Sequence, residues 1–184
     1  MSSPTARLPL PPSDARSASE ALQQHIRQAI EKTGGWLPFS DYMRLALYTP
    51  GLGYYSGGAT KFGQGGDFVT APEISPQFGT CLAATIADVL NAPELASTGQ
   101  VLEVGAGTGQ LAVQILRSLE ARGTLPLQYC ILELSGELQL RQRERLQQEV
   151  PHLASRVTWL DTLPAGFRGV IIGNEVLDAM PCAL

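Results

Sequence analysis

The most informative part of this sequence for the fold is the stretch Val101-Leu102-Glu103-Val104-Gly105-Ala106-Gly107-Thr108-Gly109-Gln110-Leu111. A short apolar run ends in three glycines at alternate positions, and a helical pattern follows at once. This order is typical of a strand, a tight turn and a helix N-terminus, because glycine permits sharp turns and close approach of a ligand to the backbone. An acidic residue, Glu103, stands two places before the first glycine. A carboxylate there accepts hydrogen bonds and repels phosphate, which favours a ligand that carries a cation or hydroxyl groups.

The glycine turn is compatible with three ligand classes: NAD(P), a flavin and S-adenosylmethionine. A dinucleotide fingerprint requires G-x-G-x-x-G, and its third glycine would stand where this chain has Gln110. The observed spacing is E-x-G-x-G-x-G, from Glu103 through Gly105 and Gly107 to Gly109. Glu103 can reach a methionine ammonium, directly or through water, and the glycines admit the amino-acid and ribose portions. The spacing therefore favours S-adenosylmethionine; a nucleotide-dependent oxidoreductase and a purely structural turn are the alternatives.

From Gln100 onward, apolar runs alternate with helical patterns. This alternation predicts an α/β fold with a parallel sheet covered on both faces. A polar-faced helix is expected over 136–150, between the second and third strands. The expected strands are Val101–Val104, Leu127–Leu134, Val157–Leu160 and Gly169–Gly173.

Acidic and amide residues follow these strands at their carboxyl ends. Glu133 ends the second strand, Asp161 follows the third, and Asn174-Glu175 follows the fourth. Ligands of open parallel sheets bind outside the carboxyl ends of the strands. We expect Glu133 to accept the ribose hydroxyls and Asp161 to meet the adenine amino group. The alternatives are a solvated strand end for Glu133 and a helix cap or solvated turn for Asp161.

The first half of the chain carries helix signals instead. Ser17–Glu20 has a capping-box pattern, Ser40 can cap a second helix, and Ser75-Pro76 is typical of a third helix start. Residues 51–66 are rich in glycine, which indicates a long loop or hairpins. The domain prediction has three parts: a disordered tail over 1–16, a helical and Gly-rich region packing on the core over 17–98, and the first part of an S-adenosylmethionine-binding domain over 99–184.

The composition excludes several classes of protein. The chain has 184 residues, 44% of them hydrophobic, and a formal net charge of −4. An acidic chain without a basic cluster is not typical of a nucleic-acid-binding protein, and no apolar run reaches the length of a membrane span. The three cysteines and two histidines show no metal-ligand spacing, so no metal is expected.

Two segments closely resemble signatures of the MidA-like methyltransferases. They are Gly66-Asp67-Phe68-Val69-Thr70-Ala71-Pro72-Glu73-Ile74-Ser75 and Gly173-Asn174-Glu175-Val176-Leu177-Asp178-Ala179-Met180-Pro181. The upstream stretch Tyr48-Thr49-Pro50-Gly51-Leu52-Gly53-Tyr54-Tyr55 is similar to an entry segment of the same family. The resemblance runs from about His25 to Met180.

The resemblance implies a class I, Rossmann-like seven-stranded fold with S-adenosylmethionine as methyl donor. Mitochondrial members of the family are associated with assembly of respiratory complex I and with arginine methylation of one of its subunits. A protein substrate is therefore expected, in the cytoplasm of a bacterium or in the mitochondrial matrix of a eukaryote; the oligomeric state stays open. The family continues well beyond 184 residues, so we expect a chain truncated at its C-terminal side, with an incomplete sheet and doubtful activity of its own.

An arginine substrate suggests roles for the acidic residues near the last strand. A guanidinium is planar and always charged, and it suits bidentate binding by carboxylates. Glu175 and Asp178 are the first candidates for this clamp and Asn174 completes the catalytic set, while Asp67 and Glu73 are second candidates. A protein that binds cofactor and partner as an assembly factor, without turnover, is the alternative. The expected cofactor-binding residues are Glu103, Gly105, Gly107, Gly109, Glu133, Asp161, Asp67 and Thr70.

Overall fold

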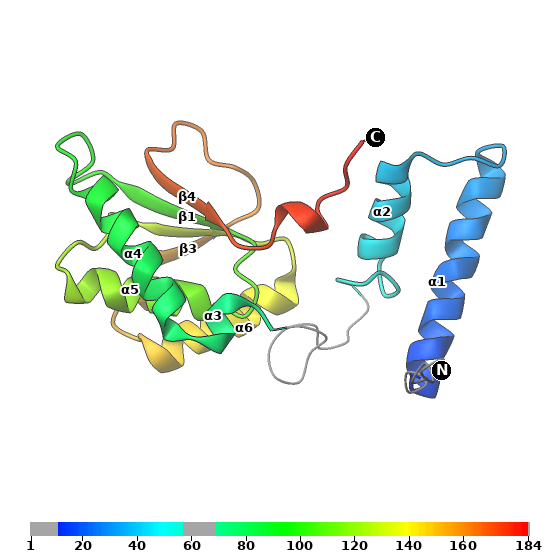
Figure 1. The fold of residues 1–184 in the computed structure, drawn as a ribbon, viewed down its shortest axis with the longest axis horizontal. Helices are drawn as coiled ribbons and strands as arrows, with labels where there is room; N and C mark the ends of the chain where they lie inside the picture. Colours follow the sequence, from blue (N-terminus) through cyan, green and yellow to red (C-terminus); the bar gives the residue numbers. More distant parts are fainter. Residues whose placement is uncertain (1–10, 57–68, 184) are drawn as a thin grey trace, which may run out of the picture. The chain divides into compact units, whose positions relative to one another are not determined.

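The computed structural model describes residues 11–56 and 69–183 (Figure 1). The chain divides into two compact units. Described residues 11–56 and 179–183 belong to the first unit, and described residues 69–178 belong to the second. The predicted domain boundary at residues 98 and 99 stays a prediction. Within the described ranges, every helix is too short or too polar to cross a membrane.

The first unit contains helices α1 (Ser13–Lys32) and α2 (Phe39–Tyr48). Helix α1 begins directly after Pro12, four residues before the start that the capping-box pattern predicted. That prediction is wrong because Ser17 is already helical, and its hydroxyl donates to the Ser13 carbonyl oxygen at 3.1 Å. Helix α1 ends before Gly34 and Gly35, since both adopt positive φ.

The second unit contains the helices around the sheet. They are α3 (Ala71–Ile74), α4 (Pro76–Leu90), α5 (Gln110–Ala121) and α6 (Gly136–Glu149), with a short 3₁₀ turn η1 (Ala154–Arg156). A second 3₁₀ turn, η2 (Leu177–Ala179), begins in the second unit and ends with the first residue of the chain's return to the first unit. The predicted cap of α4 is confirmed, because the Ser75 hydroxyl oxygen accepts a hydrogen bond from the Gln77 N–H at 3.2 Å.

Four parallel strands form the sheet, in the order β3-β2-β1-β4. They are β1 (Gln100–Val104), β2 (Tyr129–Leu132), β3 (Val157–Leu160) and β4 (Gly169–Gly173). Strands and helices alternate as the sequence predicts, which confirms the α/β class with a parallel sheet (Figure 1). The register brings the carboxyl ends level, since Val104 lies opposite both Leu132 and Gly173.

The hydrophobic core lies on the face of the sheet that the helices cover. Side chains alternate between the two faces of a strand, and Val101, Tyr129 and Ile131 point into the core together with residues of α4 and α5. Val170 and Ile172 of β4 also pack against this core, but Ile171 points to the other face and is 58% exposed. The predicted cover on both faces of the sheet is therefore absent at β4, an edge strand, among the described residues.

Candidate functional site

The carboxyl ends of the four strands place the predicted site residues in one row. The level register sets Asp161, Glu133, Gly105 and Asn174 next to one another, in the order of the strands that they follow. Backbone hydrogen bonds continue between these ends: the Gly105 N–H donates to the Leu132 oxygen at 3.0 Å, and the Glu133 N–H donates to the Leu160 oxygen at 3.4 Å. Neighbouring strands lie about 4.8 Å apart, so the row spans about 14 Å.

The glycine turn needs glycine for both conformation and space. Gly105, Gly107 and Gly109 have φ values of +64°, +53° and +81°, in the left-handed region that side chains disfavour. A Cβ on Gly109 would lie 3.3 Å from the Gln142 Cα, and one on Gly105 would lie 3.2 Å from Val176 Cγ2. Gly109 also stands at the N-cap of α5, so the turn leads directly into the helix N-terminus. The predicted strand, turn and helix start are confirmed.

Glu103 is buried on the helix-covered side of β1, with only 2% of the residue exposed. The Tyr129 hydroxyl donates a hydrogen bond to its Oε2 at 2.7 Å. Burial raises the pKa of the Glu103 carboxyl to about 7; the Tyr129 hydrogen bond opposes this shift and the neighbouring Glu133 adds to it. Burial likewise raises the pKa of the Tyr129 hydroxyl. The charge of Glu103 therefore changes near neutral pH.

Glu133 is also buried, with 8% exposed. Its Oε1 accepts the Ser135 N–H at 3.0 Å, and its Oε2 accepts from Gln142 Nε2 at 3.2 Å. The same Gln142 nitrogen donates to the Gly107 carbonyl oxygen at 2.9 Å. An ionised carboxylate offers about four acceptor sites, so two bonds from the chain leave capacity for the hydroxyls of a ligand.

Helix α3, in the segment Thr70–Ile74, is tied to the glycine turn. Glu73 Oε1 accepts from the Thr108 hydroxyl and lies 3.4 Å from Arg145 Nη1. Gln114 of α5 holds the other side of the segment, because its Nε2 donates to the Pro72 oxygen at 2.8 Å. Glu73, a second candidate for a substrate clamp, thus already binds a guanidinium of its own chain. Thr70 is half-buried just before α3, and Asp67 lies outside the described residues.

The segment after β4 has a different character. Glu175 and Asp178 are exposed and Asn174 is half-buried. Glu175 has a φ of +54°, the one positive value among the non-glycine residues that the structure describes. Such conformations occur often at functional sites, where the surrounding structure maintains them. Asp161, after β3, is exposed as well.

The sequence analysis did not identify two residues of the site, Tyr129 and Gln142, although the sequence pattern indicates a buried position for each. Tyr129 alternates with Ile131 and Glu133, which places its ring on the inward side of β2, where its hydroxyl needs a partner. Gln142 stands between Leu138 and Leu146 at intervals of four on α6, so it belongs to the buried side of that helix. A polar residue at a core position was the signal in both cases.

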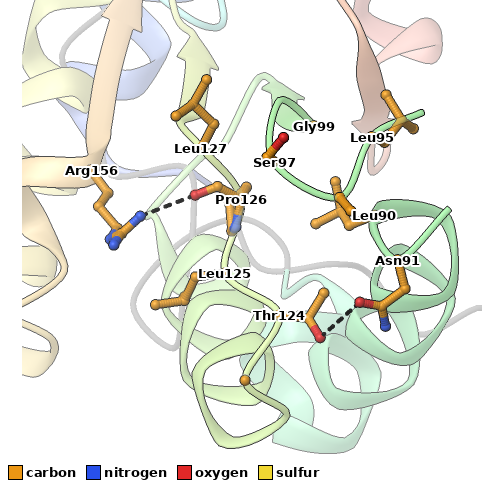
Figure 2. A pocket seen from close by; sticks show the side chains of 12 residues that line it. Leu90, Asn91, Leu95, Ser97, Gly99, Thr124, Leu125, Pro126, Leu127 and Arg156 are labelled. Atoms are coloured by element: carbon orange, nitrogen blue, oxygen red, sulfur yellow. Dashed lines mark hydrogen bonds between the residues drawn. The ribbon is translucent and has the colours of Figure 1, made fainter. Parts of the chain in front are cut away.

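A cavity of about 260 Å³ lies elsewhere in the second unit (Figure 2). It is lined by Gly99 and Leu127, which precede β1 and β2, and therefore lies at the amino ends of these strands. Arg156 Nη1 donates to the Pro126 oxygen there at 3.2 Å. This cavity is separate from the row of predicted site residues. Among residues 11–56 and 69–183, we find no cluster of His, Cys, Asp and Glu that could hold a metal ion.

Comparisons with known proteins agree with this geometry. A family model described as "Putative S-adenosyl-L-methionine-dependent methyltransferase" matches residues 81–184. The Drosophila melanogaster protein arginine methyltransferase NDUFAF7 homolog, mitochondrial, is 29% identical over 97% of this chain and 45% of its own length. The Xenopus laevis protein arginine methyltransferase NDUFAF7, mitochondrial, is 36% identical over 90% of this chain and 43% of its own length.

Solved structures show the same similarity. A crystal structure from Burkholderia thailandensis, bound to S-adenosyl-homocysteine, has 54% sequence identity and a TM-score of 0.85, and the match covers 95% of this chain and 46% of that one. A second crystal structure from the same organism has 52% identity and a TM-score of 0.81, over 95% and 44% of the two chains. The chain thus spans less than half of the length of these relatives.

Proposed function

The chain belongs to this family of S-adenosyl-L-methionine-dependent methyltransferases, and from that premise we propose that the whole protein transfers a methyl group from S-adenosylmethionine to an arginine of a protein substrate. The observation that carries the proposal is the row at the carboxyl edge, where an E-x-G-x-G-x-G turn stands beside a buried acid, Glu133. Family membership sets aside the oxidoreductase alternative.

The proposed cofactor site follows the row from β1 to β3. Gly105, Gly107 and Gly109 admit the amino-acid portion against the backbone, Glu133 accepts the ribose hydroxyls, and Asp161 meets the adenine amino group. Glu103 is buried, so in its ionised form it acts through its negative charge on the cationic methionine end. Thr70 and Asp67 complete the proposed set of cofactor-binding residues. The cofactor supplies an electrophilic methyl group on its sulfonium.

The proposed acceptor site follows β4. Glu175 and Asp178 bind the guanidinium, and Asn174 fixes the backbone that carries them. A lone pair of the guanidinium nitrogen forms the new N–CH₃ bond while the S–CH₃ bond breaks, and the nitrogen loses a proton to a carboxylate. S-adenosylhomocysteine leaves as the second product. Methyl transfer needs the nitrogen in line with the sulfonium methyl, so these residues contribute mainly by positioning.

The names of the relatives support the choice of arginine and of a protein substrate. The MidA-like resemblance makes a respiratory complex I subunit the first partner to test. The location of the protein stays a prediction: the bacterial cytoplasm, or the mitochondrial matrix. The relatives are named mitochondrial.

The test is transfer of radiolabel from S-adenosylmethionine to candidate protein substrates by the full-length protein. Label on arginine after hydrolysis is the expected result. Binding of S-adenosylhomocysteine without transfer to any candidate would favour the alternative, an assembly factor that binds cofactor and partner without turnover.

A further inference from the structure

Gln142 of α6 stands between the two segments that the proposed cofactor site requires. Its side-chain nitrogen donates to the Gly107 carbonyl oxygen at 2.9 Å and to Glu133 Oε2 at 3.2 Å. We propose that Gln142 is a positioning residue, which holds the Glu133 carboxylate at a fixed distance from the glycine turn so that it receives the ribose hydroxyls. This inference rests on the proposed cofactor site.

Both the nitrogen and the oxygen of the Gln142 side-chain amide have hydrogen-bond partners. The residue is completely buried, and its Oε1 accepts the indole N–H of Trp159 at 2.8 Å. Its three partners come from three separate places in the fold: the turn after β1, the end of β2, and β3. One side chain thus joins the ends of three neighbouring strands.

The chemistry of the partners fixes the direction of the amide. An indole N–H can only donate, whereas the Gly107 carbonyl and the Glu133 carboxylate can only accept. The oxygen of Gln142 must therefore face Trp159 and its NH₂ must face the cofactor segments. A carboxamide is the side chain that offers two donors and an acceptor at this reach. Arg143 lies over the Trp159 ring, 3.8 Å from its centroid, and restrains the indole.

Close packing restricts the movement of Gln142 and its partners. A Cβ added to Gly109 would lie 3.3 Å from both the Cα and the Cγ of Gln142, so the helix backbone is already close to the turn. The hydrogen bond to Oε2 and the Ser135 N–H on Oε1 orient Glu133 from two sides. Glu133 therefore meets a ligand in a set direction, which is the condition for selective recognition of hydroxyl groups.

Calorimetric titration of the full-length protein with two probes tests this role. The probes are S-adenosylhomocysteine and its 2′,3′-dideoxy analogue, which lacks the hydroxyls that Glu133 would bind. In Gln142→Met, which keeps the length but removes both donors, we expect about 10-fold weaker binding of S-adenosylhomocysteine, the factor that 1.4 kcal/mol represents. The affinity of the same variant for the dideoxy analogue should fall by less than about 2-fold. Gln147→Met, at an exposed position of the same helix, is the matched control and should change neither affinity.

Trp159→Phe provides a second variant that decides the matter if Gln142→Met does not fold. It removes the N–H that orients the amide, together with part of the ring under Arg143, and we expect about 3-fold weaker binding of S-adenosylhomocysteine with the analogue unaffected. Equal losses for the two probes in the folded variants would show a general structural role and overturn the inference. An equal loss in Gln147→Met would overturn it too. If the unmodified protein bound neither probe, the proposed function itself would fail, which separates the two outcomes.

Discussion

The carboxyl ends of β1 and β2 and the segment after β4 lie at the same edge of the sheet, but their acidic residues differ in burial. Glu103 and Glu133 are 2% and 8% exposed, and hydrogen bonds from Tyr129 and Gln142 hold them. Glu175 and Asp178 are exposed. A cofactor has one fixed shape, which suits groups that are oriented before it arrives. Exposed carboxylates suit a larger partner that completes their surroundings, and the proposed protein substrate is such a partner.

The largest expected effect concerns the buried region and its pH dependence. Glu103 has a pKa of about 7 in the folded chain, against the ordinary value of 4.5. An acid with a raised pKa contributes stability that is fully present below pH 4.5 and is lost as the pH rises through about 7, a loss of about 3 kcal/mol. Glu103→Gln has no such titrating group. Between pH 4.5 and pH 8, its free energy of unfolding, measured by urea denaturation, should therefore fall by about 3 kcal/mol less than that of the unmodified protein.

The amide of this variant still accepts the Tyr129 hydroxyl, so the packing is retained. Glu144→Gln, at an exposed position on α6, is the control and should keep the pH profile of the unmodified protein. Identical profiles for Glu103→Gln and the unmodified protein would contradict the assigned burial of the charge.

The next effect concerns the exposed region. Glu175→Gln should lower kcat/KM for methyl transfer about 100-fold, or about 2.7 kcal/mol, because it removes a carboxylate of the proposed guanidinium site. The affinity for S-adenosylhomocysteine should stay within about 2-fold, since Glu175 lies after β4 and outside the proposed cofactor residues. A parallel loss of cofactor affinity would remove the distinction between the two regions.

Two glycines with similar backbone conformations allow a matched test of the turn. A Cβ on Gly109 (φ +81°) would lie 3.3 Å from Gln142, whereas a Cβ on Gly123 (φ +68°) meets nothing within 4 Å. Both changes to alanine should cost about 1–2 kcal/mol of stability, the usual penalty for a side chain in the left-handed region. Only Gly109→Ala should also weaken S-adenosylhomocysteine binding, by about 10-fold in calorimetry. Equal affinities in the two variants would show that the close approach to Gln142 does not affect the site.

The smallest effect is expected at the surface of the turn. Arg145 is 30% exposed and its partner Glu73 is 18% exposed, so water weakens their attraction. Arg145→Met should lower stability by about 0.5 kcal/mol and cofactor affinity by no more than about 2-fold, in thermal and calorimetric measurements. A loss above 10-fold would place this ion pair among the determinants of the site.

The strands and the glycine turn were predictable because they depend on local patterns. Val157–Leu160 and Gly169–Gly173 match β3 and β4 residue for residue, and the predicted cap at Ser75 is present. The contacts of Gln142 and Tyr129 were not predictable as pairs, since each joins residues that are 9 to 35 positions apart. The exposure of Ile171 depends on the position of β4 at the sheet edge, which an apolar run cannot indicate.

A crystal structure of the full-length protein with S-adenosylhomocysteine tests the central claim most directly. We expect the ligand along the carboxyl ends of β1 and β2, with its ribose hydroxyls at about 2.7 Å from the Glu133 carboxylate oxygens. A ligand in the cavity between Gly99 and Leu127, or a ribose that does not contact Glu133, would contradict it.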